Sequence, residues 1–79
     1  MLRPSVVKVL PENNNILFLE FDNGEKKIFD VKPYIKGSWF KELNDISYFN
    51  RVHINGFNIE WPNDQDICPD DLYYNSVVR

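Results

Sequence analysis

The sequence predicts a small α+β domain, built from antiparallel β-hairpins, a short helical segment in the middle and a C-terminal helix, in the order βββαββα. Asn-Gly dipeptides at 23–24 and 55–56 separate runs of alternating apolar and polar residues, a pattern typical of hairpin turns. Pro69, followed by two aspartates and Leu72, has the pattern of a helix start. These observations define the expected fold class.

The size and composition favour one folded unit. With 79 residues the chain can build one hydrophobic core but not two, so we expect a single compact domain over residues 1–79. Hydrophobic residues make up 43% and aromatic residues 15% of the chain, which argues against disorder. The net charge is −3, and because phosphate contacts need a basic face, direct binding to nucleic acid is not expected.

Several features favour the cytoplasm. The single cysteine cannot form an intrachain disulfide, and the first ten residues lack the apolar core and cleavage site of a signal peptide. Apolar stretches fall well short of the roughly 20 residues that span a membrane. We therefore expect a cytoplasmic protein that does not enter a membrane.

The first half of the chain is expected to form three strands, at residues 6–10, 16–21 and 26–30. Pro11 should end the first of them. The second, ILFLEF, is almost entirely apolar, which predicts a central strand covered on both faces, or one covered by a partner chain. The turn at 22–25 has either two central residues or three with a bulge, so Glu20 faces Lys27 or Lys26.

The middle of the chain is expected to form two short helical turns between Ser38 and Phe49. Its apolar residues have nearly helical spacing, but Asn44 and Asp45 interrupt it, and Asp45 should cap the second turn. Before this segment, residues 30–37 should turn away from the sheet, with Tyr34 and Ile35 packing back on it.

The second hairpin can be predicted at the level of single pairs. A type I′ turn at Asn55-Gly56 gives the pairs Ile54–Phe57, His53–Asn58, Val52–Ile59 and Arg51–Glu60, with apolar pairs on one face and polar pairs on the other. Trp61 should lie on the apolar face of this hairpin, and Pro62 should end the strand.

The last element is a helix expected from about Pro69 to Val77. Cys68 would be its N-cap, with Asp70 and Asp71 in the first turn, at the positive end of the helix dipole. Leu72, together with Asn75 and Ser76, would mark the buried side.

An acidic cluster is the one candidate for a metal site; it comprises Asp64, Asp66, Asp70 and Asp71. An EF-hand is excluded, because the sixth position counted from Asp64 is Pro69 rather than glycine and the twelfth is Asn75 rather than glutamate. Since Asp70 and Asp71 already suit a helix start, we expect no bound metal and no cofactor.

Two residues could carry chemistry of another kind. His53 is the only histidine, and on the predicted register it lies on the polar face beside Arg51 and Asn58, without a nucleophile or an orienting carboxylate. A helix N-terminus could lower the pKa of the Cys68 thiol, but the two aspartates that follow Pro69 work against a thiolate. We therefore expect no catalytic residue.

The arrangement of motifs resembles a known family. The Asn23-Gly24 turn before Phe29-Asp30, the Trp61-Pro62-Asn63 corner, and Asp66-Ile67 followed by PDDLY are similar to those of the small bacterial family called domain of unknown function two-four-four-two. Cys68 departs from the polar or small residue expected there. The resemblance implies no established activity, but it implies a cytoplasmic protein often encoded beside another small protein, as in toxin–antitoxin pairs.

These observations lead to one functional hypothesis and two alternatives. We expect a non-enzymatic protein-interaction module, the acidic, antitoxin-like member of a two-protein pair, with a partner encoded by the adjacent gene. The first alternative is a small metal-dependent hydrolase that uses His53 with Asp64 and Asp66. The second is a structural domain that forms homo-oligomers through an exposed sheet edge.

Overall fold

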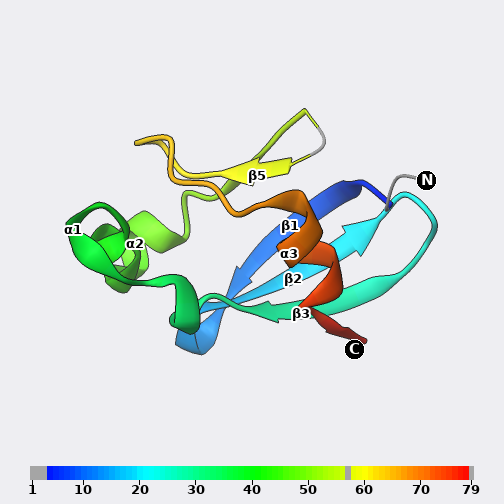
Figure 1. The fold of residues 1–79 in the computed structure, drawn as a ribbon, viewed down its shortest axis with the longest axis horizontal. Coiled ribbons are helices and arrows are strands. Elements are labelled where there is room, and N and C mark those ends of the chain that lie inside the picture. Colours follow the sequence, from blue (N-terminus) through cyan, green and yellow to red (C-terminus); the bar gives the residue numbers. More distant parts are fainter. Residues whose placement is uncertain (1–3, 57, 79) are drawn as a thin grey trace.

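A four-stranded antiparallel sheet organises the fold of this computed structural model, which describes residues 4–56 and 58–78. Its strands are β1 (Val6–Glu12), β2 (Ile16–Phe21), β3 (Lys26–Asp30) and β6 (Val77–Val78), in the spatial order β1-β2-β3-β6. A separate hairpin is formed by β4 (His53–Asn55) and β5 (Asn58–Glu60). The α+β class expected from the sequence is therefore confirmed (Figure 1).

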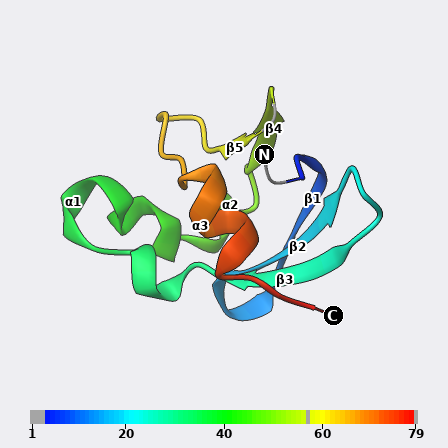
Figure 2. The same cartoon turned by 45° about the vertical axis from the view of Figure 1, so that its right-hand side comes forward.

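The helices are short, and they lie over one face of the sheet and beyond one end of its strands (Figure 2). They are α1 (Gly37–Phe40), α2 (Ile46–Phe49) and α3 (Pro69–Tyr74), together with 3-10 turns η1 (Asn13–Asn15), η2 (Lys32–Tyr34) and η3 (Lys41–Asn44). The hydrophobic core lies between the sheet, the segment 43–67 and α3; its largest fully buried apolar side chains are Trp61, Phe29, Leu17, Leu19, Leu43, Ile59 and Leu72. No helix in the described ranges is long and apolar enough to cross a membrane.

The central strand β2 is buried on one face only. Leu17, Leu19 and Phe21 belong to the core, whereas Ile16 and Phe18 on the opposite face are half-buried. The central position predicted for this strand is confirmed, but the prediction that the domain covers both of its faces is wrong. We call the less covered side the outer face of the sheet, and the side that carries Leu17 and Leu19 the inner face.

The first strand is longer than predicted. It continues through Pro11, which is paired with Leu17, to Glu12. Proline is tolerated there because β1 is an edge strand. Its open side has no neighbouring strand, so the missing N–H leaves no carbonyl group without its hydrogen bond.

The first hairpin turn has three central residues, the second of the two predicted alternatives. The Phe21 amide donates to the Glu25 carbonyl at 2.9 Å, and Gly24 has φ +91°, the left-handed conformation that this loop type needs. Glu20 consequently faces Lys26.

The register predicted for the second hairpin is wrong by two residues. His53 faces Glu60 and Ile54 faces Ile59, and Asn55 is paired with Asn58 as the last strand residue. Gly56 has φ +65°, but Asn55 is not in the left-handed region, so the turn starts one residue later than a type I′ turn at 55–56 would. The predicted partner of Ile54, Phe57, lies outside the described residues.

The middle segment forms the two predicted helical turns. The Asp45 side chain caps α2 by accepting a hydrogen bond from the Ser47 amide at 2.9 Å. Leu43 and Phe49 are buried as their spacing indicates, but Ile46 is 76% exposed because α2 is only one turn long. The side chain of Trp39 lies outside the described part.

The C-terminal helix is shorter than predicted. It ends at Tyr74, and Val77 lies in β6, where it pairs with Ile28 at the sheet edge. Leu72 and Ser76 are buried as expected, whereas Asn75 is exposed. Two β-branched residues in succession favour a strand over a helix end.

Residues 61–65 form a corner that we call the tryptophan corner. The Trp61 indole N–H donates to the Phe49 carbonyl at 2.9 Å, and the Trp61 amide donates to the Gln65 carbonyl at 2.9 Å. The fully buried Gln65 side chain accepts from the Tyr48 hydroxyl at 2.5 Å and donates to Glu42 at 3.0 Å. The corner thus fixes the second half of the chain to α2 and η3.

The corrected register can be tested with a pair of valine variants. We expect Gly56→Val to destabilise the protein by about 1–3 kcal/mol, because a β-branched residue is strained at positive φ. We expect Asn55→Val to stay within about 0.5 kcal/mol, as for other surface strand positions. Urea unfolding of both variants measures the difference; an equal, large loss for both would place Asn55 in the turn after all.

Candidate functional site

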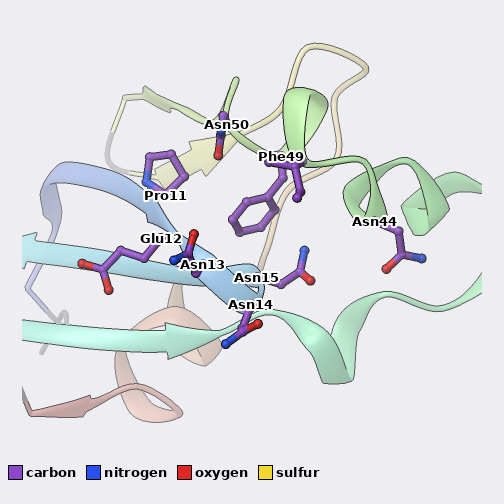
Figure 3. A pocket seen from close by; sticks show the side chains of 9 residues that line it. Pro11, Glu12, Asn13, Asn14, Asn15, Asn44, Phe49 and Asn50 are labelled. Atoms are coloured by element: carbon purple, nitrogen blue, oxygen red, sulfur yellow. The ribbon is translucent and has the colours of Figure 1, made fainter.

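An open pocket lies where the end of the first hairpin meets the middle helical segment (Figure 3). Its volume is about 540 Å³, and it is lined by Pro11, Glu12, Asn13, Asn14, Asn15, Asn44, Ile46, Phe49 and Asn50. The ring of Phe49 points toward the Asn13–Asn15 turn, and the exposed Ile46 contributes an apolar part of the rim. Sequence analysis missed this pocket because its two segments are about thirty residues apart.

The pocket is rich in amide groups. Five of its lining residues are asparagines, and Glu12 is the one titratable side chain among them. Asn14 and Asn15 have φ of +65° and +59°, a conformation that asparagine tolerates better than most residues. Asn15 is partly committed to the fold, because its Nδ2 donates to the Leu43 carbonyl at 2.8 Å. The lining therefore offers hydrogen bonds but no pair of acid and base.

His53 has a partner that the sequence did not predict. Its Nε2 lies 3.3 Å from Glu60 Oε1, and its Nδ1 lies 3.3 Å from the Arg51 carbonyl oxygen. The two-residue change in register is the reason, because it places Glu60 rather than Asn58 opposite His53. The imidazole is 48% exposed, so the pair lies on the solvated side of the hairpin, where ion pairs contribute little.

The acidic residues do not gather into one site. Asp66 forms an isolated bridge to Glu60, Asp64 has φ +69° in the tryptophan corner, and Asp70 and Asp71 occupy the first turn of α3. Across residues 4–56 and 58–78, no group of three or more His, Cys, Asp or Glu side chains is arranged to hold a metal ion.

Cys68 occupies the predicted N-cap position of α3 but does not act as a cap. Its side chain accepts no hydrogen bond from the first turn, and the residue is exposed. A thiol is a weak acceptor, which explains why Cys68 does not cap this turn.

A buried lysine joins α3 to the sheet. Lys27 Nζ donates to the Tyr73 carbonyl at 3.1 Å, lies 3.9 Å from the centre of the Tyr73 ring, and is 4.0 Å from Glu25 Oε2. The Tyr73 hydroxyl donates to Glu25, and the Tyr73 ring packs edge-on against Phe21 at 5.0 Å. Alternation along β3 places Lys27 on the same face as Phe29, a signal that could have predicted this lysine.

The outer face of the sheet carries an apolar row across all four strands. Strand pairing aligns Leu10, Phe18, Ile28 and Val77, one from each strand. Leu10 is 46% exposed and Val77 is 59% exposed. Within the described ranges α3 lies over the inner side of the sheet and α1 and α2 lie beyond one end of its strands, so these helices do not cover the row (Figures 1 and 2).

Charged residues border the row on both sides. Lys8, Glu20 and Lys26 form one neighbouring row, and Glu12, Ile16 and Asp30 form the other. An apolar strip with a charged border has the arrangement of an apolar centre and a polar rim that is common in protein interfaces.

The Glu25–Tyr73 pair should make stability depend on pH. Hydrogen bonds from Tyr73 and then Asn23, with the charge of Lys27, hold the pKa of Glu25 below its ordinary value of 4.5 against the opposing effect of burial. The stability that comes from the ionised carboxylate is present above pH 4.5 and is lost as the pH falls through the lowered pKa. Carbon-detected NMR titration should show the Glu25 pKa rising in Tyr73→Phe. An unchanged pKa in that variant would contradict the hydrogen bond as its main cause.

Comparison with known proteins gives one match. No curated protein and no solved structure is similar enough to the chain to count as a match. The family described as "Protein of unknown function (DUF2442)" matches residues 6–77, which include β1 to β3, the hairpin, α3 and the first residue of β6. This match agrees with the resemblance found in the turn, the tryptophan corner and the helix start. The chain therefore belongs to the family of proteins of unknown function DUF2442.

Proposed function

We propose that the protein is a non-enzymatic protein-interaction module that binds through the outer face of its four-stranded sheet. The observation that supports this proposal is the apolar row, which places four large apolar side chains side by side on one surface. Contiguous apolar patches of this kind mark interaction sites, whereas single exposed apolar residues do not. The half-buried, apolar β2 also fits the alternative that a partner chain covers this strand.

The partner that we propose is a protein encoded by the adjacent gene, with this chain as the antitoxin-like member of the pair in the cytoplasm. The family resemblance drawn from the sequence supports this arrangement. The net charge of −3 favours a basic partner, because complementary charge speeds encounter. The apolar row would supply most of the affinity, and the charged rows on either side would set the orientation.

Binding can be tested by placing lysines at the two exposed ends of the row. The double variant Leu10→Lys, Val77→Lys should bind the product of the adjacent gene at least about tenfold more weakly. The reason is that it puts two charged groups into the apolar row that the partner would bury. Ile46→Lys is the control for an added surface lysine, since Ile46 is 76% exposed and lies on α2, outside the apolar row. Co-purification of the two proteins at low and high salt, with circular dichroism to check folding, gives the measurement.

Two results would contradict the proposal. One is equal binding of the product by the row variant and by the Ile46 control. The other is hydrolysis of a generic ester or phosphate substrate that disappears in His53→Ala, which would favour the enzyme alternative instead.

A further inference from the structure

The charges on the outer face are separated along the strands. On β1, Lys8 and Glu12 lie two residues to either side of Leu10, and both share the outer face with it. On β3, Lys26 and Asp30 flank Ile28 in the same way. Because β1 and β3 are each antiparallel to β2, they run in the same direction, so Lys8 and Lys26 lie on one side of the apolar row, with Glu20 of β2 between them, and Glu12 and Asp30 lie on the other side.

This pattern is self-complementary under one particular rotation. Consider a second copy that is related to the first by a two-fold axis running along the apolar row. The outer faces of the two copies then meet, each strand lies opposite the same strand of the other copy, and the two strands run in opposite directions. Leu10 then faces Leu10 of the second copy, and Lys8 faces Glu12 of the second copy. Lys26 faces Asp30 of the second copy in the same way. Asp30 already forms an ion pair with Lys32 of its own chain at 3.0 Å, so the interface depends mainly on the opposite charges of β1.

We infer that a second copy of this chain covers the outer face, packed sheet on sheet with the two-fold axis along the apolar row. This inference rests on the proposed function, because it uses the same face as the binding surface. The dimer is the form of the chain without its partner, and the partner would displace the second copy from the row. Two such sheets lie about 10 Å apart, a distance at which apolar side chains from both copies interdigitate. A two-fold contact of this type closes on itself and gives a dimer rather than a filament.

The charges select this axis over its main rival. An axis along the strands would also bring the two outer faces together, but it would place Lys8 and Lys26 against the lysines of the second copy. Like charges placed opposite each other disfavour that arrangement. The face is small, since one edge strand has two residues, so the dimer belongs with weak interfaces and should dissociate on dilution.

Charge reversal on β1 tests the geometry. In Lys8→Glu, β1 carries a carboxylate on both sides of the row, and in Glu12→Lys it carries an ammonium group on both sides. Each variant alone should therefore dimerise at least about tenfold more weakly than the native chain. An equimolar mixture should restore association, because the new carboxylate at position 8 of one variant would face the new ammonium group at position 12 of the other. Lys36→Glu is the control for net charge, since Lys36 is exposed and lies outside the sheet.

Sedimentation equilibrium from about 10 µM to about 1 mM covers the range in which weak interfaces dissociate. The inference is supported if the native chain and Lys36→Glu dimerise alike, each β1 variant is weakened, and the mixture recovers. It is overturned if the native chain is monomeric throughout, or if the mixture dissociates as readily as each variant alone. In the first of these cases, loss of partner binding by the Leu10→Lys, Val77→Lys variant would leave the proposed function intact.

Discussion

The burial of Trp61 and Gln65 is the constraint on which the second half of the fold depends. Both side chains are fully buried, and each carries polar atoms that must find a hydrogen-bond partner. Trp61 finds one in the Phe49 carbonyl, and Gln65 finds two, in Tyr48 and Glu42. A buried polar group left without partners costs about 1–3 kcal/mol, so the chain from 61 to 65 has few other ways to fold. Its position then determines where α3 begins and which face of the sheet it covers.

The two faces of the sheet differ because the helices of this short chain do not cover both of them. Of the three short helices in the described ranges, α3 lies over the inner face, and α1 and α2 lie beyond one end of the strands (Figures 1 and 2). Lys27 points into that face as well, where the Tyr73 carbonyl and ring and the Glu25 carboxylate compensate for its charge. The contacts of Lys27 fix α3 over β3. The other face carries the apolar row, in which Phe18 and Ile28 are half-buried and Leu10 and Val77 are exposed.

Much of the fold follows from local chemistry that can be read in the sequence. The turn at Gly24, the cap at Asp45 and the start of α3 at Pro69 each depend on residues within a few positions of one another. The hairpin register was mispredicted for a definite reason. A shift of two residues leaves every side chain on its face, so alternation predicts that Ile54 and Ile59 share a side but does not fix which residues are paired.

The candidate sites were harder to predict because they depend on distant pairs. The pocket needs the Asn13–Asn15 turn beside Phe49, and the His53–Glu60 contact needs the correct register. The strand β6 was missed because two residues carry too little pattern to be recognised, yet Val77 completes the apolar row.

The composition of β2 connects the fold to the proposed function. The core needs only alternate residues of this strand, and Leu17, Leu19 and Phe21 meet that need. Ile16 and Phe18 point the other way, where polar residues would satisfy the sheet of an isolated domain equally well, because an antiparallel sheet can leave one face in water. The demands of the core therefore do not account for a large aromatic side chain at position 18. The contact surface that we propose on the outer face would account for it, because a partner there would bury the exposed Leu10 and Val77 in the same row as Phe18.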